Sequence, residues 1–134
     1  MNRTEALKYL NSDKSINIAV ISISSFDDEY PVFINESMPA LMLRFDDVDK
    51  GYPNCITEND AKQIVEFINK TIANGCEKLI VHCGAGISRS AGVAGAIMKY
   101  IHDDDRPIFK NPKYRPNIHC YRMVLNEFNK KAYL

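Results

Sequence analysis

The sequence predicts an α/β domain in which a mostly parallel sheet is covered by helices. Short β-branched segments at 16–23, 38–45 and 79–81 are typical of strands, and longer segments with apolar residues every three or four positions follow them. Strands that alternate with helices through short links favour a parallel sheet. The chain has 134 residues and no Pro-, Gly- or Ser-rich linker, so we expect one domain over residues 1–134.

The first two strands are predicted from alternation. Residues 16–23 alternate and are rich in β-branched side chains, and residues 38–45 place Leu41, Leu43 and Phe45 on one face. The chain must then turn between 46 and 53, because glycine and proline close together break regular structure.

A helix is predicted after Thr57, which is a good N-cap residue. Asp60 follows three residues later, where a capping box has its acid. Gly75 is expected to end the helix. Its apolar stripe comprises Ile64, Phe67, Ile68 and Ile72.

The second half of the chain repeats the strand-helix pattern. Residues 79–81 are short and wholly apolar, as in a strand buried on both faces. A helix rich in glycine and alanine is predicted from Ser90, and its small residues are expected to pack closely against the sheet. A last helix is predicted at 117–130, with four inward-facing residues: Tyr121, Val124, Leu125 and Phe128.

Composition excludes several classes of function. Lys and Arg total 17 and Asp and Glu total 17, so no general affinity for nucleic acid is expected. The longest apolar run, 91–98, is far short of the roughly 20 residues that cross a bilayer. The N-terminus does not resemble a secretory signal, and the four cysteines form no CxxC pair. We therefore expect reduced thiols and a cytoplasmic protein without a membrane partner; the sequence leaves its oligomeric state open.

The stretch from His82 to Ser90 reads His-Cys-Gly-Ala-Gly-Ile-Ser-Arg-Ser and joins the buried strand to a helix. Inward backbone N–H groups and a helix N-terminus can together hold a phosphate-like anion. The same surroundings lower the pKa of a thiol from about 8.5 to roughly 3.5–7.5, so Cys83 is the expected nucleophile. The expected phosphate-binding residues are Gly84, Ala85, Gly86, Ile87, Ser88 and Arg89.

Two side chains at the end of this stretch have specific expected roles. The planar fork of Arg89 can bind two phosphate oxygens at once. The hydroxyl of Ser90 can hydrogen-bond the Cys83 sulfur, which makes the sulfur a better leaving group. A buried cysteine is more often only a small hydrophobic residue, but packing does not explain this combination of residues in one turn.

Residues 82–90 match the HCxxGxxRS signature of the protein tyrosine phosphatase superfamily and most resemble the dual-specificity phosphatases. The segment Arg115-Pro116-Asn117 is similar to the Ser-Pro-Asn segment of that family. The resemblance implies a central, mostly parallel sheet with helices on both faces. It also implies hydrolysis of phosphate monoesters through a phosphocysteine, without metal or cofactor, and a supporting role for His82. Some relatives protect the catalytic cysteine by a disulfide; whether Cys55, Cys76 or Cys120 does so here stays open.

This chemistry needs a carboxylic acid that protonates the leaving oxygen. Three candidates, Asp46, Asp47 and Asp49, follow the second strand. Asp47 is favoured, since 43–47 resembles the apolar-x-apolar-x-Asp pattern of the dual-specificity enzymes. Asp49 is the alternative, since 49–53 resembles the Asp-x-Gly-x-Pro of other tyrosine phosphatases. A third interpretation leaves all three as solvated loop acids.

The predicted function is hydrolysis of phosphotyrosine in a protein or small aryl phosphate, with phosphoserine and phosphothreonine left open. The absence of lysine from 84–88 disfavours an inositol-lipid substrate. The alternatives are a non-catalytic phosphate-binding module, or another cysteine-loop enzyme such as an arsenate reductase or a rhodanese-like protein. The loop lies past the midpoint of the chain, unlike that of arsenate reductases, and a rhodanese would not require Ser90 or an upstream acid.

Overall fold

Three parallel strands form the sheet: β1 (Ile18–Ser24) lies between β2 (Ala40–Arg44) and β3 (Lys78–His82). The computed structural model describes residues 2, 4–6, 17–27 and 38–131. Ile21 of β1 pairs with Leu41 of β2 and with Val81 of β3. All three predicted strands are therefore present, although Ile16, at the predicted start of the first, lies outside the described residues.

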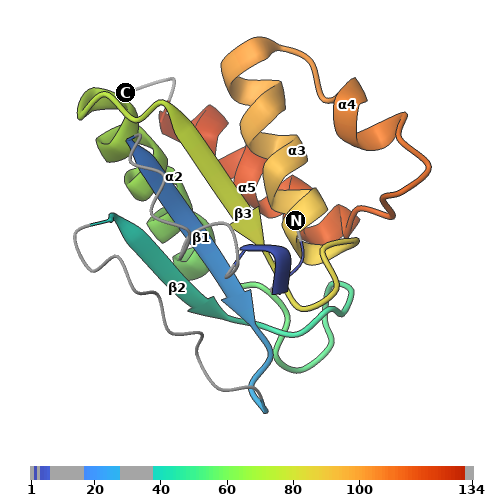
Figure 1. Ribbon diagram of the computed structural model, residues 1–134. Helices are drawn as coiled ribbons and strands as arrows, with labels where there is room; N and C mark the ends of the chain where they lie inside the picture. The colour runs from blue at the N-terminus through green and yellow to red at the C-terminus, as the bar shows by residue number, and fades with distance from the viewer. Residues whose placement is uncertain (1, 3, 7–16, 28–37, 132–134) are drawn as a thin grey trace.

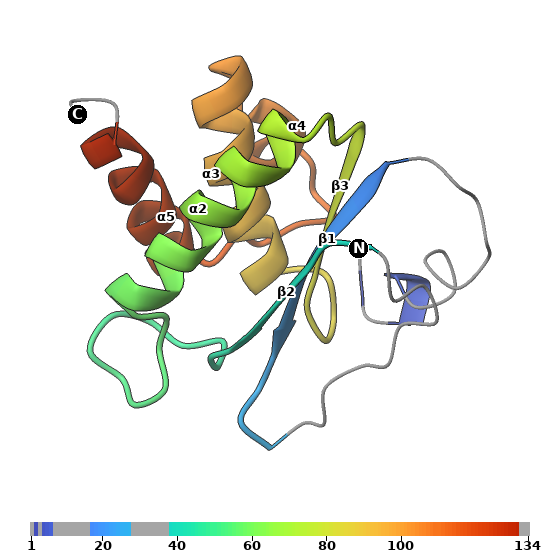
Figure 2. The same ribbon diagram turned by 90° about the vertical axis from the view of Figure 1, so that its left-hand side faces the viewer.

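Four helices accompany the sheet: α2 (Glu58–Ala73), α3 (Arg89–His102), α4 (Arg106–Phe109) and α5 (Ile118–Lys131). Figures 1 and 2 place α2, α3 and α5 on one face of the sheet. The other face carries, within the described part, the helical turn at 4–6, where Ala6 packs with Ile18, Val20 and Ile80. The α/β class and the parallel sheet agree with the sequence prediction. The short α4 was not anticipated.

Helix α2 begins as predicted but buries a slightly different stripe. The Thr57 hydroxyl accepts a hydrogen bond from the Asp60 N–H, and the Asp60 carboxylate accepts one from the Thr57 N–H, which completes the capping box. Gly75 follows the helix with φ +80°, a conformation that glycine adopts without strain. The prediction that Ile72 faces the core is wrong, since its side chain is 53% exposed. The buried stripe ends instead at Thr71. At 100° per residue Ile72 still shares the direction of Ala61 and Val65, so its exposure follows from its place in the last turn of the helix.

The glycines of α3 allow a close approach, but not to the sheet as predicted. A Cβ on Gly92 would lie 2.5 Å from the carbonyl oxygen of Asn117, and one on Gly95 would lie 3.2 Å from the Phe109 ring. Both glycines therefore face the segment that runs from α4 into α5. This packing draws the start of α5 toward the start of α3.

The main core lies between the sheet and the helices. Ile21, Phe45, Ile64, Val93 and Phe128 are among its fully buried members. Within the described ranges, none of the helices has the length and apolar character that crossing a membrane requires.

Candidate active site

The loop at 83–88 joins the carboxyl end of β3 to the start of α3, and Figure 1 shows it at the edge of the sheet where β1 also ends. Because the strands are parallel, the residues that follow β1 and β2 meet at this same edge. Side chains from three strand ends are thereby gathered around one loop.

The Cys83 sulfur is held inside this loop. The Gly86 N–H donates to Sγ at 3.3 Å, and the Ser90 hydroxyl oxygen lies 3.2 Å from Sγ in hydrogen-bond contact. Burial by itself raises the pKa of the thiol. Hydrogen bonds from the Ser90 side chain and from the backbone of Ser90 and Gly86, with the charge of Arg89, outweigh burial and leave the pKa of Cys83 below its ordinary value.

Gly86 gives the loop its shape. Its φ of +73° lies in the left-handed region, which residues with a side chain seldom adopt. This conformation aims its N–H at the Cys83 sulfur. A glycine is therefore required here for a backbone reason, in agreement with its place in the signature.

The Arg89 side chain is almost fully buried. Its Nη1 donates to the Ser25 hydroxyl at 2.9 Å and to the Phe45 carbonyl oxygen at 3.0 Å. Its Nη2 lies 3.5 Å from where a Cβ on Gly84 would stand. Residues that follow β1 and β2 thus fix the guanidinium against the loop after β3.

Of the three candidate acids, Asp47 is the one hydrogen-bonded to the loop. Its Oδ1 accepts from the Ser88 hydroxyl at 2.7 Å and from the Asn117 side-chain amide at 2.9 Å. The carboxylate is exposed, so it can be approached from solvent. Asp47 therefore stands beside the loop with one oxygen anchored.

The other two acids accept hydrogen bonds from residues outside the loop. Asp46 accepts from the Phe26 N–H at 3.2 Å and from the Asn54 amide at 3.2 Å. Asp49 accepts from the adjacent Lys50 N–H at 2.7 Å. The structure places neither in hydrogen-bond contact with residues 83–90.

Asn117 connects the acid to the last helix. Its amide also donates to the Val48 carbonyl oxygen at 3.1 Å, and its Oδ1 accepts from the Cys120 N–H at 3.0 Å, as an N-cap does. The sequence analysis names Asn117 only as part of a family-like segment and predicts no role for it. Ser25 is not among the predicted site residues. A Pro-Asn pair before an amphipathic helix could have indicated the cap, and the position of Ser25 just after a parallel strand could have indicated the site.

The remaining candidates are packed around the loop. His82 ends β3, pairs with Ser22 of β1 and is buried. Cys120 belongs to the same core cluster as Cys83, and burial raises its pKa to about 12. Within the described residues, no cluster of His, Cys, Asp and Glu has the makings of a metal site.

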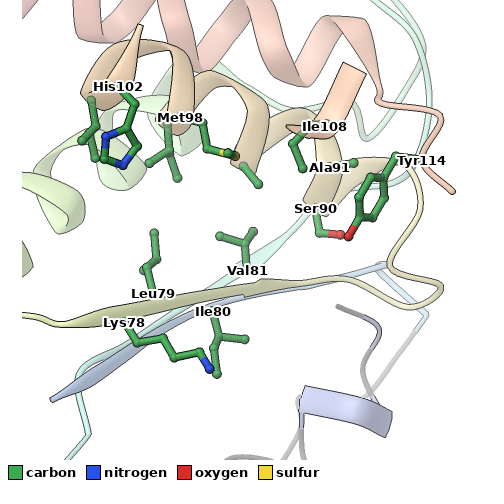
Figure 3. A pocket seen from close by; sticks show the side chains of 13 residues that line it. Lys78, Leu79, Ile80, Val81, Ser90, Ala91, Met98, His102, Ile108 and Tyr114 are labelled. Carbon is green, nitrogen blue, oxygen red and sulfur yellow. The ribbon is translucent and has the colours of Figure 1, made fainter. Parts of the chain in front are cut away.

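A cavity of about 370 Å³ lies between β3 and α3. Figure 3 shows Leu79 and Val81 facing Met98 across it, with the hydroxyls of Ser90 and Tyr114 at one end. Its walls are mainly aliphatic, so the cavity does not suit a phosphate group. The loop is therefore the candidate anion site.

Comparison with known proteins finds similarity in structure alone. No protein-family model matches the sequence, and no curated protein matches it. Among solved structures, the chain is similar to the human tyrosine phosphatase-like serine/threonine/tyrosine-interacting protein, with 22% identity and a TM-score of 0.60 over 88% of this chain and 80% of that one. It is also similar to DUSP15, with 23% identity and a TM-score of 0.63 over 95% of this chain and 80% of that one. A third similar structure is Tk-PTP in the active form, with 17% identity and a TM-score of 0.61 over 98% of this chain and 88% of that one. At these identities the likeness is one of fold.

Proposed function

We propose that this chain, which has the dual-specificity-phosphatase-like fold of the protein tyrosine phosphatase superfamily, is a phosphatase that hydrolyses phosphotyrosine through a phosphocysteine. The observation that carries the proposal is the position of the Cys83 sulfur, which accepts the Gly86 N–H at 3.3 Å and lies 3.2 Å from the Ser90 hydroxyl oxygen, in the loop that ends at Arg89. A thiolate beneath an anion site is a nucleophile directed at phosphorus.

In the first step the Cys83 thiolate attacks phosphorus, so that the S–P bond forms as the ester P–O bond breaks. The backbone N–H groups of 84–88 and the Arg89 guanidinium bind the phosphoryl oxygens and stabilise the charge that develops on them. Asp47 gives its proton to the departing oxygen, which is otherwise a poor leaving group.

In the second step a water molecule attacks the phosphocysteine. Asp47, now a carboxylate, takes the proton from this water, and the S–P bond breaks to release phosphate. The Ser90 hydroxyl, 3.2 Å from the sulfur, stabilises the thiolate that leaves. No external reactant other than water is required.

The assignment of the acid rests on the contacts between Asp47 and the loop. Its anchored oxygen keeps the carboxyl group beside the Cys83 loop, whereas Asp49 accepts a hydrogen bond from the backbone N–H of Lys50. The leaving group of a substrate bound in the loop would therefore meet Asp47 first.

The test compares hydrolysis of aryl phosphates by the wild type and three variants. Cys83→Ser should have no measurable turnover. Asp47→Asn should lose roughly 10²- to 10⁴-fold on a substrate with a poor leaving group and should lose the pH limb that reports the acid. Asp49→Asn, the matched control, should keep both the rate and that limb.

The outcomes separate the proposal from its alternatives. If Asp47→Asn keeps the full rate while Asp49→Asn loses it, the acid is misassigned. If the wild type binds orthovanadate but hydrolyses no aryl phosphate, the loop is a non-catalytic phosphate-binding module.

A further inference from the structure

The cavity between β3 and α3 is built from aliphatic side chains of both elements. Leu79 and Val81 face it from β3, and Met98 faces it from α3 (Figure 3). These three side chains are only half-buried, and Ile101, which also lines the cavity, is 42% exposed. A molecule in solution can therefore reach these apolar walls, whereas the main core is closed to it.

The cavity has the size and lining of a small-molecule site. Its volume is about 370 Å³, and sites for small molecules typically measure roughly 300–1,000 Å³. Such sites are mostly apolar and contain a few polar groups that orient the ligand. Here the polar groups at one end are the hydroxyls of Ser90 and Tyr114.

The two ends of the cavity differ in the head group that they suit. Lys78 begins β3 and His102 ends α3, so both lie away from Ser90, and both are exposed. Water screens a charge contact at that end, but Ser90 is buried and its hydrogen bonds are not weakened in this way. None of the described residues that line the cavity is Asp or Glu. The stronger polar contact is therefore available to an uncharged head group at the hydroxyl end.

Ser90 belongs both to the cavity and to the surroundings of Cys83. Its hydroxyl oxygen lies 3.2 Å from the Cys83 sulfur, and the same side chain lines the cavity. A hydroxyl oxygen can accept a hydrogen bond while its own proton is directed elsewhere. A ligand hydroxyl at this end can therefore donate to Ser90 while the Ser90 proton remains directed at the sulfur.

We propose that this cavity binds a neutral aliphatic alcohol, with its chain between β3 and α3 and its hydroxyl on Ser90. The aliphatic walls remove the chain from water, which is the main source of affinity. The hydroxyl fixes the orientation of the chain and contacts the residue that hydrogen-bonds Cys83. The proposal does not rest on the proposed function, because binding requires no turnover.

The first test measures binding to the full-length wild type by isothermal titration calorimetry. The probes are n-butanol, n-hexanol and n-octanol, with octanoate as a charged analogue of similar length. We expect the affinity of the alcohols to rise about fourfold per added methylene, as burial of each methylene predicts. Octanoate should bind about tenfold more weakly than n-octanol, because its carboxylate would lose water on entering an aliphatic cavity.

A bulky side chain in the cavity should block the site. Ala94 lines the cavity and is half-buried, so Ala94→Leu should weaken n-octanol binding about tenfold or more. Ala73→Leu is the matched control, because Ala73 is exposed at the end of α2 and does not line the cavity. It should bind n-octanol like the wild type. Melting temperatures establish that both variants fold.

A second variant removes the polar contact without adding bulk. Tyr114→Phe should weaken n-octanol binding about two- to tenfold, which is the net value of one hydrogen bond. Tyr52→Phe is its control, because Tyr52 is 63% exposed and does not line the cavity. It should leave the affinity unchanged.

The contact with Ser90 is tested through Cys83. At about pH 6, saturating n-octanol should raise the rate of Cys83 alkylation by iodoacetamide about two- to fivefold in the wild type. The reason is that a donor to Ser90 strengthens the hydrogen bond that Ser90 makes to the sulfur. The same alcohol should leave the rate unchanged in Ala94→Leu.

Several results would overturn the inference. They are an affinity that does not rise with chain length, octanoate binding as tightly as n-octanol, and a folded Ala94→Leu protein that binds n-octanol like the wild type. An alkylation rate that saturating n-octanol leaves unchanged would show that the hydroxyl does not contact Ser90. Hydrolysis of p-nitrophenyl phosphate by the wild type reports separately on the proposed function, so the two ideas can fail independently.

Discussion

Two buried cysteines of this protein have pKa shifts of opposite sign. Burial raises the pKa of both thiols, but at Cys83 the hydrogen bonds from Ser90 and Gly86 outweigh it. At Cys120 burial dominates and raises the pKa to about 12. The lowered pKa of Cys83 gives it a larger thiolate fraction than an ordinary thiol has at the same pH, while Cys120 stays protonated at neutral pH.

Alkylation tests this difference. We expect iodoacetamide to modify Cys83 with a midpoint below the value of about 8.5 typical of a free thiol, because the folded state favours the thiolate. Cys120 should stay unmodified up to about pH 9, since its pKa is about 12. Peptide mass spectrometry measures both sites in one sample. A midpoint for Cys83 near 8.5, with no protection by orthovanadate, would remove the basis of the proposed nucleophile.

Asn117 is a positioning residue for Asp47. Asn117→Ala should lose about 1 kcal/mol of stability with the helix cap and should slow turnover mainly for substrates with poor leaving groups. Asn117→Ser is the matched comparison, because it keeps a capping oxygen, loses the amide donor to Asp47 and adds no second carboxylate beside it. It should recover stability and not the rate. A leaving-group dependence equal to that of the wild type in both variants would show that Asn117 acts through stability alone.

At the scale of elements, the packing of α3 against α5 brings Asn117 to the site. Gly92 permits it, since a Cβ there would meet the Asn117 carbonyl oxygen at 2.5 Å. The segment that caps α5 is the one that also holds Asp47 and the loop. Packing between two helices is thereby coupled to the position of the acid.

Substitution of the two glycines measures this coupling. Gly92→Ala should cost about 1–3 kcal/mol of unfolding free energy, because backbone atoms have little room to move. Gly95→Ala should cost less, since its nearest neighbour is the Phe109 ring at 3.2 Å, a side chain that can shift. Urea denaturation gives both values. A Gly92→Ala protein as stable as the wild type would contradict the close approach.

At the scale of the whole molecule, Arg89 joins the ends of all three strands. It begins α3 after β3, and its side chain reaches Ser25 after β1 and Phe45 after β2. An anion bound in the loop should therefore stabilise the entire fold, because binding to the native state shifts the unfolding equilibrium.

Orthovanadate should raise the melting temperature of the wild type, with a gain of about 2.7 kcal/mol at a hundred times its dissociation constant. Arg89→Lys should lose most of this shift, because lysine lacks the fork that can hold Ser25, Phe45 and an anion together. Differential scanning fluorimetry with and without the ligand measures the effect. An equal shift in both proteins would mean that the guanidinium is not a ligand.

Local features of the sequence determined the elements and the centre of the candidate site. Periodicity, the Thr57 capping box and the strand-loop-helix around Cys83 involve residues a few positions apart, so the sequence alone is enough to predict them. Only the tertiary structure decided which acid adjoins the loop, what the α3 glycines pack against, and that Ser25 and Asn117 belong to the site. Those contacts join residues 41 positions apart for Ser88 and Asp47, 64 for Arg89 and Ser25, and 70 for Asn117 and Asp47. The physical reason is that the register of the sheet and the packing of the helices bring such distant residues together, and no local pattern specifies either.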